Sequence, residues 1–383
     1  MDFVTLLYYR DVVHFLPVCH TVLKALGFGQ DEAVEAAKRE RAAYVSFSTD
    51  VSKITVAKAD GISQFSVEGC EIRTSTSGAV AGGGVSERGG PQNALEDLFI
   101  AEQMLDSYFM FIVAKESPRR LDLYSKKAGK TVKTIYMDTK ITGVKHNSKR
   151  FLITTEDSLH LFDLESFQRL QKFPVYDLGK ADLSQDEASV IAYPSSTQGE
   201  IRLFDGINLK HLKPLRMHES SIAQFALSPD GSLLASASKK GTVIRVADVQ
   251  SGQILYSFCR SLVKEALVYS LVFSPDNEFL CSSSETGTLH LFHLAETERK
   301  FVENVKHLAL NVIPSLEPLD RPKSLAVCKL ETCEEDTKIG LKIVDGKLHV
   351  FVLPSNGILD IFKVERAGGD TRFEKYAGYD LLA

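Results

Sequence analysis

Two clusters of hydroxyl, glycine and basic residues lie in neighbouring repeats of this sequence. The first reads SASKKGTVIR over residues 236–245, the second reads SETGTLH over residues 284–290, and Arg260 lies between them. A guanidinium binds phosphate through two parallel hydrogen bonds, hydroxyls donate to the remaining oxygens, and glycine lets a backbone N–H approach closely. These residue types therefore predict a site that holds phosphate without transforming it.

Each residue also has a purely structural interpretation. Serines cap β-turns, and the recurring Gly-Thr pair serves the turn itself. Arg245 could pair with Asp248 or Asp230, and His290 could hydrogen-bond within its own repeat. The co-occurrence of these residues with Arg260 favours the binding interpretation.

The charge is distributed unevenly along the chain. The formal net charge is -5, which argues against a general nucleic-acid binder. Between Lys210 and Lys264, however, eight basic residues stand against three acidic ones, so this stretch carries +5 and the remainder -10. The asymmetry predicts one anionic partner, bound by one sector of the protein, although a solvated patch without function is the alternative.

Neither a metal site nor an enzyme is indicated. Six cysteines are scattered without a C-x-x-C pair, which predicts reduced thiols in a cytosolic protein. His290 and His293 are three apart on a predicted strand and would face opposite sides. No G-x-S-x-G, P-loop, H-E-x-x-H or Rossmann fingerprint is present. We expect no cofactor, no metal and no catalysis.

An internal repeat determines the predicted fold. Ser228-Pro229-Asp230 and Ser274-Pro275-Asp276 lie 46 residues apart, as do Gly241-Thr242 and Gly287-Thr288. The Ser-Pro-Asp turn is expected to join the first and second strands of each unit, and the glycine turn the second and third. Further units are indicated near residues 98–136, 141–173, 188–215 and 338–364. Asp50 also precedes Gly61 by 11 residues, as Asp230 precedes Gly241 and Asp276 precedes Gly287, which indicates one more unit.

Seven units of about 40–45 residues with short strands predict an all-β, seven-bladed β-propeller with WD-like blades. No Trp-Asp dipeptide occurs, because the sequence contains no tryptophan. We expect a short helical N-terminal extension at residues 1–41, the propeller at 42–366, and a tail at 367–383 that could complete the last blade. Residues 73–93 are predicted to form a flexible loop. Residues 295–321 should form an apolar loop in blade six, which either folds back on the propeller or touches a membrane.

The sequence resembles the PROPPIN family, β-propellers that bind phosphoinositides and act in autophagy. The resemblance covers about residues 42–366, and its most specific part includes HESSIA at 218–223, LASAS at 234–238, GTVIRV at 241–246 and GTLHLF at 287–292. The family carries a Phe/Leu-Arg-Arg-Gly turn between blades five and six. Here that turn reads Phe258-Cys259-Arg260-Ser261, so the first arginine and the glycine are missing.

The resemblance implies two headgroup half-sites, which are unequally preserved. The first would use His218, Ser236, Ser238, Gly241, Thr242 and Arg245, with Cys259 where an arginine is expected. The second would use Arg260, Ser284, Thr288 and His290, with Ser261 in place of glycine. Histidines near pH 6 would add a cation, so binding is expected to strengthen in mild acid.

The resemblance further implies a monomeric, non-enzymatic effector of phosphatidylinositol 3-phosphate, or of the 3,5-bisphosphate. It would act as a peripheral protein on the cytoplasmic face of autophagosome-precursor or endosomal membranes, as an adaptor that recruits a large lipid-transfer protein. A scaffold propeller for protein interactions, with a degenerate lipid site, is the alternative. The changes at Cys259 and Ser261 are the evidence for that alternative.

Overall fold

The computed structural model describes residues 41–58, 61–74, 98–176, 180–261, 264–294, 323–367 and 370–382. The predicted N-terminal helix, most of the predicted loop at 73–93, and the blade-six loop at 295–321 lie outside these residues. Within them, no helix is long and apolar enough to cross a membrane.

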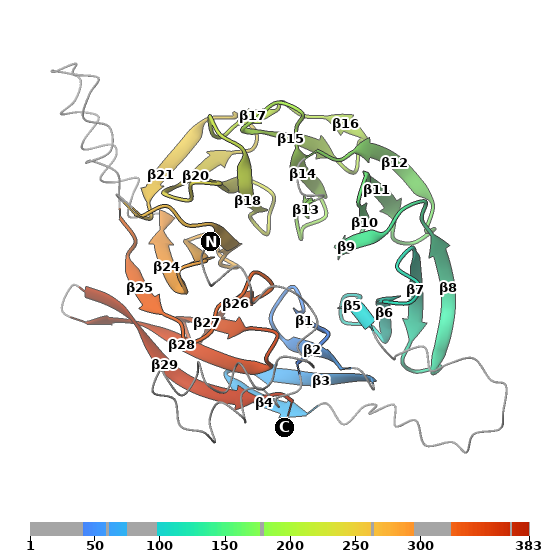
Figure 1. Ribbon diagram of the computed structural model, residues 1–383, viewed down its shortest axis with the longest axis horizontal. Helices are drawn as coiled ribbons and strands as arrows, with labels where there is room; N and C mark the ends of the chain where they lie inside the picture. The colour runs from blue at the N-terminus through green and yellow to red at the C-terminus, as the bar shows by residue number, and fades with distance from the viewer. Residues whose placement is uncertain are drawn as a thin grey trace, which may run out of the picture. The chain divides into compact units, whose positions relative to one another are not determined.

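The strands form seven antiparallel sheets arranged as blades around a central channel (Figure 1). Blades one to three comprise β1 (Tyr44–Phe47), β2 (Lys53–Lys58), β3 (Gly61–Glu68), β4 (Glu71–Thr74), β5 (Leu98–Gln103), β6 (Phe109–Ala114), β7 (Arg120–Ser125), β8 (Lys130–Tyr136), β9 (Ile141–His146), β10 (Arg150–Thr155), β11 (Ser158–Asp163) and β12 (Arg169–Pro174). Blade four comprises β13 (Asp182–Leu183), β14 (Val190–Pro194), β15 (Glu200–Asp205), β16 (Lys210–His211) and β17 (Leu215–Arg216).

Blades five to seven carry the predicted site and close the ring. They comprise β18 (Ile222–Leu227), β19 (Leu233–Ser238), β20 (Val243–Asp248), β21 (Ile254–Cys259), β22 (Val268–Phe273), β23 (Phe279–Ser284), β24 (Thr288–His293), β25 (Ala326–Lys329), β26 (Lys338–Val344), β27 (Lys347–Leu353), β28 (Ile358–Ala367) and β29 (Asp370–Asp380). The all-β seven-bladed propeller is confirmed.

The repeated Ser-x-Asp turn joins the first two strands of a blade, as predicted. In blade five, Ser228 Oγ donates to Asp230 Oδ1 at 2.6 Å, and Leu233 N donates to Ser228 Oγ at 2.9 Å. In blade six, Phe279 N likewise donates to Ser274 Oγ at 2.9 Å. The side chains thus satisfy backbone groups that the turn leaves without a ladder partner, which explains why the motif recurs.

The ring is closed by side-chain packing between the first and last blades. Val45, Ile54 and Val56 of blade one form one buried cluster with Phe351 and Ile361 of blade seven. Each of these two blades takes all four strands from one end of the chain, as the strand colours of Figure 1 show. The hydrophobic effect of this interface, rather than a shared strand, therefore holds the ring closed.

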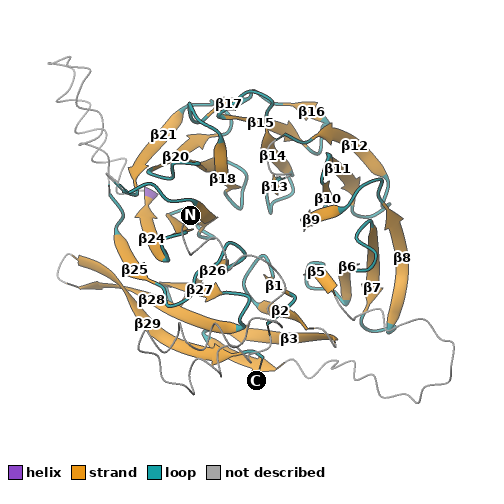
Figure 2. Ribbon diagram, in the orientation of Figure 1, coloured by secondary structure: helices purple, strands orange, loops and turns teal. Residues whose placement is uncertain are grey.

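The tail at residues 367–383, which could complete the last blade, supplies its fourth strand, because β29 pairs with β28 over its whole length. One boundary differs from that expected. Strand β4 includes Arg73 and Thr74, which fall in the predicted loop, because Arg73 pairs with Ser66 across the sheet and forms ion pairs with Glu68 and Glu71. Between the strands, the described residues form loops and turns (Figure 2).

Candidate phosphate-binding site between blades five and six

The blade-six cluster is a connected hydrogen-bond network. Ser284 ends β23 and Thr288 begins β24, and the Thr286 hydroxyl lies in the turn between them. The three hydroxyl oxygens form a triangle, with Ser284 to Thr286 at 3.0 Å, Ser284 to Thr288 at 2.9 Å and Thr286 to Thr288 at 2.9 Å. His290 Nε2 lies 3.2 Å from the Thr288 hydroxyl.

Arg260 brings a cation to this triangle. It follows β21 at the end of blade five, and its Nη1 donates to Ser284 Oγ at 3.4 Å. Its Nε donates to the Gly241 carbonyl and its Nη2 to the Lys264 carbonyl at 3.1 Å. These hydrogen bonds fix the guanidinium and satisfy its donors in a buried position. Among the described residues, no carboxylate pairs with Arg260. The structure therefore brings together all four residues predicted for the second half-site.

Blade three has the same turn with an anion built into it. Thr155, Ser158 and His160 stand where Ser284, Thr288 and His290 stand in blade six, at the end of the second strand and the start of the third. There the Thr155 and Ser158 hydroxyls both donate to Asp157 Oδ1 at 2.9 Å, and Thr139 donates to the same oxygen at 2.6 Å. These hydrogen bonds lower the pKa of Asp157, so it is ionised. In blade six, by contrast, no carboxylate among the described residues hydrogen-bonds to the three hydroxyls, and the Arg260 guanidinium contacts Ser284.

The first half-site is built from the segment before blade five and the strands β19 and β20. His218 Nε2 lies 3.1 Å from Ser236 Oγ, and Arg245 pairs with Ser236 across the sheet. Arg245 Nη1 donates to the Met217 carbonyl at 2.6 Å, which ties the guanidinium to the segment that carries His218. His218, Ser236 and Arg245 therefore lie together, as predicted.

The glycine turn after β19 belongs to both half-sites. Gly241 N donates to the Ser238 carbonyl at 2.8 Å, and the Gly241 carbonyl accepts the hydrogen bond from Arg260 Nε. The Thr242 carbonyl accepts from Arg260 N at 2.9 Å. Ser238, Gly241 and Thr242, assigned to the first half-site, thus position the arginine of the second through the backbone. This connection between the two half-sites was not predicted.

Cys259 is buried at the end of β21, opposite Val243 of β20. A thiol is a weak hydrogen-bond donor and carries no positive charge when protonated. Cys259 therefore supplies no cation to the first half-site, whose predicted guanidinium is that of Arg245. The second half-site keeps its predicted guanidinium, that of Arg260.

The site histidines are neutral at pH 6 in the unliganded protein. Burial lowers the pKa of His218 to about 4, and the nearby Arg245 cation acts in the same direction. Burial lowers the pKa of His290 to about 4 as well, with Arg260 as the second cause. The expectation that these side chains carry a cation near pH 6 is therefore wrong for the free protein, because desolvation disfavours the charged imidazolium.

Acidification should instead destabilise the fold. The unfolded chain binds a proton at each histidine near pH 6.5, whereas His218 and His290 in the folded protein bind one only near pH 4. Between these values the unfolded state holds more protons, so stability falls as the pH falls. We expect a loss of about 1 kcal/mol per histidine between about pH 7 and about pH 5.5.

Urea denaturation at the two pH values would measure this loss. A His218→Gln variant should lose part of the pH dependence, because glutamine does not titrate. A pH dependence as large as that of the wild type would contradict the assignment.

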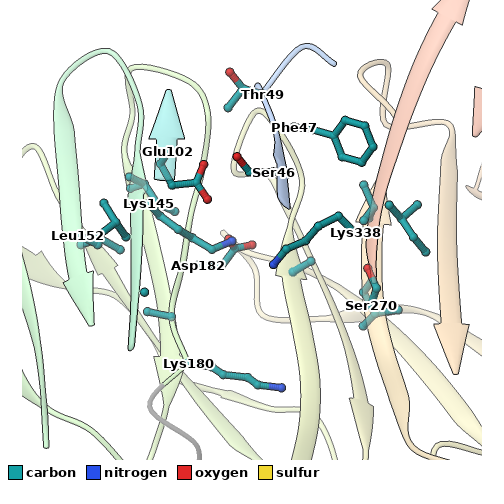
Figure 3. Close-up of a pocket in the computed structure, with 18 of the residues that line it drawn as sticks. Ser46, Phe47, Thr49, Glu102, Lys145, Leu152, Lys180, Asp182, Ser270 and Lys338 are labelled. Carbon is teal, nitrogen blue, oxygen red and sulfur yellow. The ribbon is translucent and has the colours of Figure 1, made fainter. Parts of the chain in front are cut away.

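The central channel contains a second cluster of charges that sequence reasoning missed. The cluster lines a cavity of about 620 Å³ in the channel, whose wall consists mainly of the first strands of the blades. Figure 3 shows that Glu102, Lys145, Asp182 and Lys338 converge in this cavity. Lys145 Nζ pairs with Asp182 Oδ1 at 2.5 Å, and Glu102 accepts a hydrogen bond from Tyr44. These four residues are too far apart in the sequence to form a motif, so no sequence signal indicated the cluster. Because their charges compensate one another, this network is suited to holding the inner strands together.

Fold and site together define a seven-bladed propeller with a cation-and-hydroxyl site of the kind that binds phosphate. The family model described as PROPPIN matches residues 43–306, and the chain belongs to this family.

Similar proteins include the human WD repeat domain phosphoinositide-interacting protein 1, which is 28% identical over 341 residues, or 85% of this chain and 74% of that protein. Autophagy-related protein 18 of Caenorhabditis elegans is 27% identical over 351 residues, or 85% of this chain and 83% of that protein. The structure of Hsv2 from Kluyveromyces lactis has a TM-score of 0.69 at 14% identity and covers 89% of this chain and 99% of its own. The last comparison bears on the fold alone.

Proposed function

We propose that this protein is a phosphoinositide effector and that the blade-six cluster is its principal headgroup site. The observation that carries the proposal is the hydroxyl triangle of Ser284, Thr286 and Thr288 beside the buried guanidinium of Arg260. The matching turn of blade three is completed by the Asp157 carboxylate. A phosphate group would supply the corresponding anion in blade six.

The ligand is phosphatidylinositol 3-phosphate or the 3,5-bisphosphate, presented on the cytoplasmic face of autophagosome-precursor or endosomal membranes. Two relatives support this proposal, because one is named as phosphoinositide-interacting and the other as autophagy-related. The protein acts without catalysis, as a monomeric adaptor that brings a large lipid-transfer protein to the membrane. Its site residues include Thr286 in addition to those that the sequence predicted.

A vesicle flotation series tests the proposal. The full chain should float with vesicles that contain the 3-phosphorylated lipid or the 3,5-bisphosphate, and remain in the dense fraction with otherwise identical vesicles that contain unphosphorylated phosphatidylinositol. Phosphatidylserine vesicles of equal total charge control for a general attraction to anionic surfaces. Equal flotation with all compositions would contradict headgroup recognition.

The alternative is a scaffold for protein interactions whose lipid site is degenerate. The observation in its favour is Cys259, a buried thiol at the position where the family has an arginine. Under this alternative the protein would float with none of the vesicles in the series.

A further inference from the structure

Lys329 places a second cation at the blade-six cluster, and the inference drawn from it rests on the function proposed above. Lys329 is the last residue of β25 and pairs with Thr288 across the sheet. Its Nζ donates to the Thr286 carbonyl, and a Cβ added to Gly287 would lie 3.2 Å from this Nζ. The ammonium group therefore lies against the turn that carries the hydroxyl triangle.

Two cations thus contact one cluster, Arg260 from the segment after β21 and Lys329 from the end of β25. Arg260 reaches the Ser284 hydroxyl, Lys329 reaches the backbone of Thr286, and the hydroxyls of these two cluster residues are 3.0 Å apart. Among the described residues, neither cation has a carboxylate partner. Glu285, in the turn itself, accepts a hydrogen bond from Leu267 N at 3.3 Å, and Glu331, two residues after Lys329, pairs with Lys375 at 3.7 Å. The two positive charges are therefore not compensated within the cluster.

The strand register shows which residue of blade five corresponds to Lys329 of blade six. Val243 begins β20 as Thr288 begins β24, and Val243 pairs with Cys259 just as Thr288 pairs with Lys329. Lys329 in blade six thus occupies the position that Cys259 occupies in blade five. The charge absent from the first half-site is present at the matching position of the second.

The two cations also differ in mobility. Arg260 is 8% exposed and has three hydrogen-bond acceptors, so it is preorganised for one phosphate. Lys329 is exposed, and its flexible stem lets the ammonium move away from the Thr286 carbonyl toward a ligand. One phosphate carries a charge of about -1.5 to -2 at neutral pH, so a headgroup with two phosphates gains most from a second cation.

We propose that Lys329 binds the second phosphate of a doubly phosphorylated inositol headgroup and so determines the preference of the blade-six site for a bisphosphate over a monophosphate. Arg260 and the hydroxyl triangle bind the first phosphate. The matching position of blade five, occupied by Cys259, offers no cation for a second phosphate.

Lys329→Gln tests this role, because glutamine removes the charge and retains much of the length. We expect the variant to bind vesicles containing the 3,5-bisphosphate about 10-fold more weakly than the wild type, with less than about a threefold change for the 3-phosphate, as loss of one charge-assisted partner predicts. Lys342→Gln is the matched control. It removes the same charge from a lysine whose Nζ also donates to a backbone carbonyl, that of Val67 at 3.0 Å.

The outcomes separate the inference from the proposed function. A wild type that binds neither lipid would overturn the proposed function and the inference with it. A wild type that binds both, with Lys329→Gln weakened equally for the two lipids or for neither, would overturn the inference alone.

Competition by the soluble bisphosphate headgroup, and not by inorganic phosphate at the same concentration, would support recognition of two phosphates. Equal competition by inorganic phosphate would contradict it.

Discussion

Replacing Arg260 with alanine should lower the affinity for vesicles containing the 3-phosphorylated lipid by about 10- to 150-fold. Loss of one charge-assisted hydrogen-bonding partner costs about 1.5–3 kcal/mol, and Arg260 is the one guanidinium that contacts the hydroxyl triangle among the described residues. Arg260→Lys should recover only part of the loss, because an ammonium lacks the planar fork that binds two phosphate oxygens. Quantitative flotation over a range of lipid concentrations measures both variants.

Arg260 also donates to the carbonyls of Gly241 and Lys264, so a structural role must be separated from a binding role. Arg150→Ala is the matched control. Arg150 Nε donates to the Gly206 carbonyl at 2.9 Å and its Nη1 pairs with Asp163 in blade three, away from the cluster. Both variants should lose stability in thermal melts, and only Arg260→Ala should lose lipid binding. Equal loss of lipid binding in the two would assign Arg260 to the fold alone.

Replacing Gly241 with alanine should destabilise the protein by about 2–4 kcal/mol and weaken both half-sites. Its φ of 61° lies in the left-handed region, and an added Cβ would lie 1.9 Å from the Ala266 carbonyl oxygen. The turn must therefore move, which adds the cost of a backbone clash to the cost of the left-handed conformation. Since the Gly241 carbonyl accepts the hydrogen bond from Arg260, this movement also releases the guanidinium.

Gly129→Ala isolates the effect of the clash. Gly129 has nearly the same φ, 63°, and an added Cβ would meet no atom within 4 Å. This control should cost about 1 kcal/mol, as expected for a left-handed alanine in open space. Urea denaturation gives both values, and a similar cost for the two variants would show that the Ala266 contact has no importance.

Much of the fold could be predicted because its determinants are local. The Ser-x-Asp turns of blades five and six satisfy their own backbone groups within a few residues, so the motif indicates the turn wherever it occurs. The recurrence of short strand patterns predicted the blades, and the count of seven repeat units predicted that the blades close into a ring. The short strand β13 escaped detection, because two residues show no alternation.

The candidate site was predicted as two sets of residue types, and the structure assembles each set. Its less predictable features depend on side-chain geometry and on burial, which residue types alone do not give. Thr286 was visible in the sequence as a turn residue, and only the three distances among the hydroxyls make it part of the cluster. The histidines were expected to be cationic, and burial reverses that expectation.

The sequence by itself determined the blade repeat, the all-β class and the gathering of hydroxyls, glycines and arginines in blades five and six. These features follow from short-range hydrogen bonding and from alternation along a strand, which are properties of neighbouring residues. Only the tertiary structure decided that Gly241 holds Arg260 and that Lys329 reaches the turn at Thr286. Packing of one blade against the next, and pairing of strands across a long connection, set these contacts, and no local pattern records them.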